Sequence, residues 1–426
     1  MITFSRFELD NGLRLIVHPD DSTPMVAINV LYQVGSRDES PDRTGFAHLF
    51  EHLMFGGSVN IPDFDGPIQL AGGENNAFTN TDITNFYDIL PAENLEVGLW
   101  LESDRMLSLL FSKKSLSVQR KVVVEEFKET CINEPYGDVW HHISDLAYRV
   151  HPYRWPTIGL VPEHVEKARL KDVEDFFYRY YRPNNAVLVI AGKVDPEEVH
   201  HLVRKWFGDI PAGVVPEKQL PVEPAQAGFV SREVQAKVPL DSLYLVFHTC
   251  GRMHPDFYAL DLLSDVLGNG QSSRLYRRLL KERKLFSHID CYITGTVDPG
   301  LLILEGRPSK GVAMDAAEAA LWEELTELTR TPVSETELEK LVNKSESTLE
   351  FSEASVLNKA MNLAFFEMLG DAGLINAEGE KYRAVTSEDI LRVAQEIFRR
   401  ENCSRLLYLS AEPSDIGFPE DEEEDE

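Results

Sequence analysis

The chain has no hydrophobic run long enough to cross a membrane. None of its apolar stretches approaches the roughly 18 residues that a membrane-spanning helix needs. Its beginning has neither the basic patch nor the apolar core of a signal peptide, which predicts a cytoplasmic protein, although a processed periplasmic form would begin in the same way. The hydrophobic content of 43% is still sufficient for sizeable cores, so we expect a soluble globular protein of two or more domains.

Cysteine and positive charge are also scarce. The four cysteines match no C-x-x-C pattern, which predicts scattered reduced thiols at Cys131, Cys250, Cys291 and Cys403. Lysine and arginine number 42 against 71 aspartates and glutamates, which gives a formal net charge of -29. This charge argues against a nucleic-acid partner, because phosphates would be repelled, and it favours cationic peptides. General solubility is the alternative explanation and accounts for most of these charges.

The most informative motif is H-x-x-E-H, formed by His48, Glu51 and His52. Residues 44–58 are predicted to form the helix that carries it, with an Asp-Arg-Thr-Gly start and a Gly-Gly stop. Positions i, i+3 and i+4 share one face of a helix, so the three side chains would converge. Two neutral imidazoles can hold zinc, which lowers the pKa of a bound water from about 15.7 toward roughly 7, and a carboxylate base can complete its activation. The alternative, a helix with two histidines by chance, fits the helix boundaries less well.

A catalytic zinc site needs a third protein ligand, because water takes the fourth position. Candidates lie on a predicted amphipathic helix at residues 113–133, which contains Glu125, Glu126 and Glu129. The residue types alone leave these three carboxylates open as alternatives.

The spacing of H-x-x-E-H and a V-V-x-E-E helix about 74 residues later resembles the inverted-zincin family of pitrilysin, insulin-degrading enzyme and mitochondrial processing peptidase. This resemblance implies one Zn²⁺ per chain, Glu126 as the third ligand and Glu51 as the general base. The family often has another glutamate two turns before that ligand. Gln119 stands there in this chain, and it can form hydrogen bonds beside the site but cannot titrate.

A G-G-x-x-N-A-x-T segment at residues 72–79 is similar to the family segment that forms an edge strand beside the metal. Unpaired backbone groups at a sheet edge can pair with an extended peptide. The resemblance therefore implies that Asn76, Ala77 and Phe78 bind substrate. By itself the segment would be read as an ordinary Gly-Asn turn before a strand.

The order of predicted elements repeats along the chain. The first part has a hairpin at residues 7–17, strands at 26–32 and 186–191, and helices at 44–58, 92–110, 113–133, 138–150 and 163–181. A second strand at 242–248 precedes a helix that begins near residue 254. Where the first helix carries the motif, the second has Asp261, Ser264 and Asp265, so the second half has no predicted metal site.

The repeat and the resemblance together predict an α+β fold of two tandem similar domains, each a mostly antiparallel sheet packed with helices, facing each other as a clamshell. The predicted bounds are a zinc-bearing catalytic domain at 1–210, a Pro- and Gly-rich linker at 211–229, a metal-free homologous domain at 230–412 and an acidic disordered tail at 413–426.

Residues 270–280 are similar to the second half of the family, in which an Arg and, seven residues on, a Tyr grip the substrate. Leu280 and Ser287 stand at those positions, so the grip is missing. Nearby cations that could replace it are Arg277, Arg278 and Arg283. The chain thus resembles the zinc-bearing, processing-peptidase beta-like subunit of a two-subunit bacterial enzyme, with a homologous zinc-free partner supplying the Arg/Tyr pair.

We therefore predict a zinc metalloendopeptidase that hydrolyses short or unfolded peptides as the catalytic subunit of a hetero-oligomer. One alternative is a noncatalytic assembly subunit of the same fold, which would explain the missing grip but would not need a complete zinc motif. Another is S-ribosylhomocysteine lyase, which also has H-x-x-E-H but is a small single domain and does not fit the repeated halves.

Overall fold

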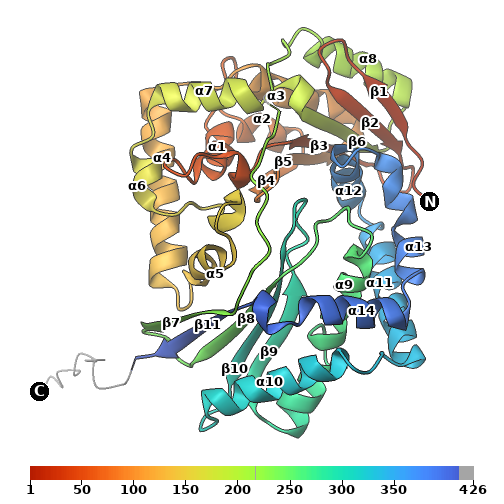
Figure 1. Cartoon of the computed structure of the whole chain (residues 1–426). Coiled ribbons are helices and arrows are strands. Elements are labelled where there is room, and N and C mark those ends of the chain that lie inside the picture. Colours follow the sequence, from red (N-terminus) through yellow and green to blue (C-terminus); the bar gives the residue numbers. More distant parts are fainter. Residues whose placement is uncertain (216, 412–426) are drawn as a thin grey trace, which may run out of the picture.

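Two sheets with the same strand order organise the protein (Figure 1). The computed structural model describes residues 1–215 and 217–411, so the predicted acidic tail lies outside the described residues. The first sheet has the spatial order β1-β2-β6-β3-β5-β4, formed by β1 (Ser5–Glu8), β2 (Arg14–Pro19), β3 (Met25–Tyr32), β4 (Glu74–Thr79), β5 (Thr84–Pro91) and β6 (Ala186–Gly192). The second has the order β7-β11-β8-β10-β9, formed by β7 (Val230–Ala236), β8 (Ser242–His248), β9 (Phe286–Ile293), β10 (Leu301–Pro308) and β11 (Cys403–Ser410).

The two sheets are equivalent strand by strand once β1 is set aside. Each is antiparallel except for one parallel pair, β2 with β6 in the first sheet and β7 with β11 in the second. In each sheet the third strand of the repeat, β4 or β9, lies at an edge and pairs with the strand that follows it. This correspondence confirms the predicted α+β fold of two similar, mostly antiparallel domains.

Helices surround both sheets. Those of the first half are α1 (Phe46–Phe55), α2 (Asp65–Leu70), α3 (Leu95–Leu107), α4 (Lys113–Phe127), α5 (Val139–Ala147), α6 (Pro162–Glu166), α7 (Leu170–Tyr180) and α8 (Pro196–Phe207). Those of the second half are α9 (Phe257–Leu267), α10 (Met314–Leu328), α11 (Glu335–Ser352), α12 (Val356–Met368), α13 (Glu378–Arg383) and α14 (Ser387–Ile397). None of the helices in the described part of the chain is long and apolar enough to span a membrane.

The single helix predicted at residues 163–181 is wrong, because the structure divides it into α6 and α7. Arg169 adopts an extended conformation between them. Its backbone N–H and its guanidinium both donate to the Asp172 carboxylate, which caps the start of α7. The prediction also omits α2 and α8, although Asp195 and Pro196 are a clear start signal for α8: the aspartate accepts hydrogen bonds from two backbone N–H groups.

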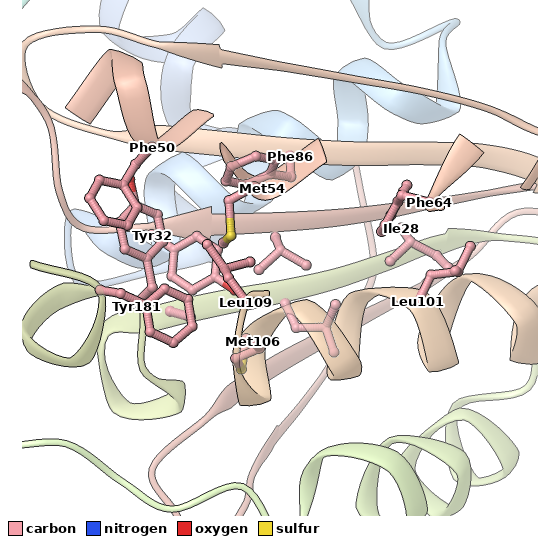
Figure 2. Close-up of a cluster of buried hydrophobic side chains, with 14 of the residues drawn as sticks. Ile28, Tyr32, Phe50, Met54, Phe64, Phe86, Leu101, Met106, Leu109 and Tyr181 are labelled. Carbon is pink, nitrogen blue, oxygen red and sulfur yellow. The ribbon is translucent and has the colours of Figure 1, made fainter. Parts of the chain in front are cut away.

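The core of the first domain fixes the position of α1. Figure 2 shows Phe50 and Met54 of this helix among side chains of the sheet and of α3, including Tyr32 and Phe86. Both helix residues are fully buried. Burying such side chains contributes about 1.5–3 kcal/mol each, so the helix is held with one face against the sheet and the opposite face free for other contacts.

Each sheet is covered on its second face by a helix from the other half of the chain. Helix α12 packs against β3 and β6 of the first sheet, where Leu363 is fully buried (Figure 1). Helix α5 packs against β8 and β11 of the second sheet, where Ile143 is buried. This exchange explains why β3 and β6 are buried along almost their whole length rather than at alternate positions, since both of their faces lie in a core.

The segment between the two sheets is tied to the first domain. Its described residues at 211–215 and 217–229 contain no helix or strand. The Lys218 ammonium donates to the Asp38 carboxylate at 2.8 Å, and the Glu223 carboxylate accepts hydrogen bonds from three backbone N–H groups at residues 149–151, each at 2.9 Å. The segment and the exchanged helices therefore join the two halves at several places.

Candidate metal centre

The start of α1 is held from outside the helix. Gly45, the residue before the helix, has a φ of +83°, which favours glycine. The buried Glu39 carboxylate accepts hydrogen bonds from the Gly45 N–H at 2.9 Å and the Ala47 N–H at 2.7 Å. Two of the N–H groups that a helix start leaves unpaired are thereby satisfied. Glu39 is the residue at this site that sequence reasoning missed, because a lone glutamate nine positions before a motif gives no local signal.

Helix α4 supplies the facing side of the centre. Ser112 caps its start by accepting a hydrogen bond from the Ser115 N–H at 3.0 Å. Val123 and Val124 are buried in the domain core, and Glu126, two residues further on, is directed at α1, with which α4 packs. The two helices thus bring together a histidine pair and a carboxylate that are far apart in sequence.

The three candidate donors lie within a few ångströms of one another. The Nε2 atoms of His48 and His52 are 3.3 Å apart. From Glu126, Oε1 lies 3.6 Å from His48 Nε2 and Oε2 lies 3.3 Å from His52 Nε2. Within the described residues this is the one group of three or more His, Cys, Asp or Glu side chains whose donor atoms all lie within 4.8 Å of one another.

This donor set fits zinc. Zinc–nitrogen and zinc–oxygen bonds of about 2.0–2.1 Å in a tetrahedron place the ligand atoms about 3.3–3.4 Å apart. The two histidine nitrogens, 3.3 Å apart, match that spacing, and the two Glu126 oxygens each lie 3.3–3.6 Å from one of these nitrogens. Burial lowers the pKa of the His48 imidazole, which keeps its ring neutral and its lone pair free at pH 7. The hydrogen bond with His52 lowers the pKa of the Glu126 carboxyl, which keeps it ionised.

The other candidates on these helices are placed differently. Glu125 is 72% exposed at its side chain and pairs with Lys128 at 2.8 Å, and Glu129 is exposed. Glu51 is half-buried on α1, one turn from His48 and adjacent to His52. Gln119 is half-buried on α4, with its amide beside the end of α1 at Gly56. The structure therefore gathers the two histidines with Glu126, and neither of the two neighbouring glutamates joins them.

Strand β4 is an edge beside α1. It pairs only with β5 in the first sheet and packs against α1. Asn76 and Phe78 are exposed, whereas Ala77 is half-buried against the domain core. The Asn76 side chain accepts a hydrogen bond from the Ala77 N–H at 2.8 Å. Among the described residues no strand pairs with the other side of β4, as the resemblance implied for the segment at residues 72–79.

A pocket of about 400 Å³ lies next to these elements. Thr130 and Cys131, one turn beyond Glu126, form part of its wall, and Thr81 follows the end of β4. Aromatic and aliphatic side chains dominate the rest of the lining, among them Trp140, Tyr148, Trp155 and Ile158. The pocket is completed by Thr294, Thr296 and Leu301 from the second half of the chain.

The arginines considered as a replacement grip are engaged elsewhere. Arg278 pairs with Glu324 and Glu327 of α10, at 2.7 and 2.5 Å. Arg283 pairs with Glu323 of the same helix at 2.8 Å. Arg277 is mostly exposed, and Ser287 donates to a backbone carbonyl within the second sheet. Arg277 also lies 3.9 Å from the Glu282 carboxylate, so all three cations face carboxylates of their own domain.

Comparison with known proteins places this fold in a class. A family model described as "Insulinase (Peptidase family M16)" matches residues 14–159, and one described as "Peptidase M16 inactive domain" matches residues 167–345. The chain belongs to peptidase family M16.

Individual relatives extend over nearly the whole chain. The zinc protease PqqE of Helicobacter pylori is 30% identical over 94% of this chain and 91% of its own length. The crystal structure of a protease from Helicobacter pylori has a TM-score of 0.90 with 27% identity, covering 96% of this chain and all of that one (100%). A probable mitochondrial-processing peptidase subunit beta of Arabidopsis thaliana is 27% identical over 61% of this chain and 50% of its own length. The two-domain architecture matches solved structures of the family, and the homologues are named zinc proteases.

Proposed function

We propose that this protein is a zinc metalloendopeptidase in which His48, His52 and Glu126 bind the metal. The observation that carries the proposal is the tetrahedral spacing of their donor atoms, 3.3–3.6 Å apart, across α1 and α4. The names of the homologues support it, and so does the absence of a second such donor group among the described residues.

The proton transfers of the reaction are assigned to Glu51. Zinc supplies a Lewis acid that polarises the scissile carbonyl and lowers the pKa of water. Glu51 lies on the same face of α1 as the two histidines, so its carboxylate takes the proton from the attacking water. The same carboxyl then gives this proton to the leaving amine, which completes hydrolysis without any other acid.

The substrate is an extended peptide. The free side of β4 offers backbone N–H and C=O groups to one further strand, with Asn76, Ala77 and Phe78 beside the metal-binding helix. The neighbouring pocket of about 400 Å³ gives an apolar side chain of that peptide a place. The net charge of -29 favours peptides with lysine or arginine.

The protein acts as one subunit of a hetero-oligomer. Leu280 and Ser287 provide neither a guanidinium nor a phenol, and Arg278 and Arg283 are bound to glutamates of α10. A homologous zinc-free subunit would supply the Arg and Tyr that position the substrate carbonyl. The similarity to a relative named as a subunit beta supports this division.

Hydrolysis of an unstructured fluorogenic peptide tests the proposal. The zinc-loaded protein should cleave the peptide, lose activity with a chelator and regain it with one equivalent of zinc. Mass spectrometry should show internal cleavage. Peptide binding without cleavage, in the presence of bound zinc and a zinc-free homologue, would favour the noncatalytic assembly subunit instead.

A further inference from the structure

The tips of two equivalent hairpins meet between the domains. Residues 80–83 connect β4 to β5 in the first sheet, and residues 294–300 connect β9 to β10 in the second. The β9–β10 hairpin extends from its sheet toward the first domain (Figure 1). The metal-free domain therefore reaches the end of the strand that we propose to bind substrate.

Asp82 is the centre of this contact. It is 4% exposed and lies three residues after the end of β4. Its Oδ2 accepts a hydrogen bond from the Val297 N–H at 3.0 Å, which crosses from one domain to the other. Its Oδ1 accepts a hydrogen bond from the Tyr153 hydroxyl at 2.5 Å and forms an ion pair with the Arg37 guanidinium at 2.7 Å. Every oxygen of this buried carboxylate is thus bound.

A second carboxylate, from the hairpin itself, completes the junction. The Arg37 guanidinium that holds Asp82 also donates to Asp298 at 3.0 Å. The Tyr153 hydroxyl, which donates to Asp82, accepts a hydrogen bond from the Asp298 N–H at 3.1 Å. The Arg37 N–H in turn donates to the Thr81 carbonyl, also at 3.0 Å. The Asp82 side chain and the Thr81 backbone of the β4–β5 turn are therefore held by Arg37 and Tyr153. Both of these residues also bind Asp298 of the β9–β10 hairpin.

This junction matters because β4 is an edge. A strand with one neighbour has half the backbone hydrogen bonds of an inner strand, so its order depends on what holds its ends. A peptide that pairs with β4 binds most tightly when that strand is already ordered. Its binding free energy is then not reduced by the entropy cost of ordering the strand. The turn at Asp82 is the end of β4 that the other domain reaches.

We propose that the β9–β10 hairpin tip of the metal-free domain is a positioning element for substrate binding, which fixes the β4 edge through Asp82, Tyr153 and Arg37. The proposal rests on the proposed function, since β4 must be the peptide-binding edge. The same hairpin contributes Thr294 and Thr296 to the pocket beside Thr81, so it shapes the peptide site as well as bracing it. The metal-free domain then has a role in peptide binding and none in the chemical step.

Tyr153→Phe is the most selective test, because it removes the shared hydroxyl and keeps the ring. Asp298→Ala removes the hairpin carboxylate from Arg37. Each should raise KM for an extended peptide about five- to twentyfold and change kcat less than twofold, since one or two hydrogen bonds are lost between the hairpin and the β4–β5 turn and none from the reaction. The matched control is Asp20→Asn, which breaks the 2.6 Å pair with Lys359 that also joins the two halves but lies away from β4.

Amide hydrogen exchange gives a readout that does not depend on activity. Residues 74–83 should exchange at least severalfold faster in Tyr153→Phe and in Asp298→Ala than in the parent or in Asp20→Asn. Parent-like exchange at these residues would overturn the bracing, whether or not the protein is a peptidase. Faster exchange with an unchanged KM in an active protein would overturn the positioning role. Failure of the zinc-loaded parent to cleave any peptide even when mixed with a zinc-free homologue would instead overturn the proposed function, and the exchange data would still show whether the hairpin fixes β4.

Discussion

Helices α1 and α9 occupy equivalent positions in the two domains, yet only α1 presents metal donors. Each follows the second strand of its repeat, β3 or β8, and precedes the edge strand. On α1 the histidine Nε2 atoms contact each other and the Glu126 carboxylate, the polar partners that the described residues offer them. On α9 the Asp261 carboxylate accepts a hydrogen bond from the Tyr382 hydroxyl at 2.5 Å, and Asp265 lies 3.5 Å from the Lys344 ammonium.

The difference lies in what packs over each helix. Helices α11, α13 and α14 cover α9, and burial raises the pKa of Asp261. On α1 the side chains of His48 and His52 remain 13% and 25% exposed, enough to bind an ion from solvent. The same arrangement of strands and helices therefore has two outcomes. The face of α1 is half-open and presents two imidazoles, whereas the face of α9 is closed and each of its carboxylates has a partner within its own domain.

Removing a donor from α1 or α4 should have the largest effect. His48→Ala, His52→Ala and Glu126→Gln should each reduce zinc affinity by more than the 10- to 100-fold typical of residues that only orient a ligand, and peptide hydrolysis should fall to background. Metal analysis after dialysis measures this. Glu125→Gln on α4 and Asp265→Asn on α9 are the controls and should retain zinc. Retention in Glu126→Gln with loss in Glu125→Gln would move the third ligand.

Replacing the base should separate binding from chemistry. Glu51→Gln should keep zinc and fold but slow peptide hydrolysis by roughly 10²- to 10⁴-fold, the usual contribution of a positioned general base, equal to about 3–5 kcal/mol of barrier. Matched zinc loading of parent and variant is the control. A parent-like rate in Glu51→Gln would leave α1 as a metal-binding helix without a catalytic role.

Adding a zinc-free homologous subunit should raise the rate of peptide hydrolysis about 10²-fold, because a misplaced substrate typically lowers the rate by that factor. The isolated chain should be a weak peptidase, because Leu280 and Ser287 give no grip on the substrate carbonyl. Mixing it with a zinc-free homologue that carries the Arg/Tyr pair measures the gain. Efficiency of about 10⁴ M⁻¹s⁻¹ or more for the chain alone, with no increase on mixing, would contradict the divided site and return attention to Arg277.

Weakening the contact between α12, from the second half of the chain, and the first sheet should lower the stability of both domains at once. Leu363→Ala on α12 should cost about 2–5 kcal/mol of unfolding free energy, because a fully buried leucine is truncated. Calorimetry should show one transition for the whole chain at a lower temperature. Phe351→Ala, at a side chain that is 80% exposed, should leave the transition within about 0.5 kcal/mol of the parent. Two transitions, with only one shifted, would show that the domains are independent.

The features that sequence could predict are local ones. His48, Glu51 and His52 lie within five positions, so helical periodicity alone brings them to one face. The two-domain α+β fold followed from the repeated order of strands and helices together with the family resemblance. The break at Arg169 was missed because apolar spacing continues across it, and its cap is visible only in the structure. The hydrogen bond between Asp82 and Val297 joins residues that are far apart in sequence and follows no periodic pattern. No local feature of the sequence therefore predicts it.

The predicted domain boundary shows a related difficulty. A proline-rich segment at residues 211–229 separates two repeats in sequence, but packing crosses it in both directions through α5 and α12. A proline-rich composition indicates where the chain is extended. It does not report which helix covers which sheet, because the apolar stripe of α12 is the same whichever sheet receives it.

The exchange of helices also has a consequence for synthesis. The first sheet is complete once β6 has left the ribosome, but its second face stays bare until α12 follows. At translation rates of roughly 5–20 residues per second that interval lasts on the order of 10–30 s. During it the apolar side chains of β3 and β6 face water, so the nascent chain presents a surface for holding chaperones. We expect ribosome-bound chains that end before α12 to be chaperone clients, and chains that extend past it to be released.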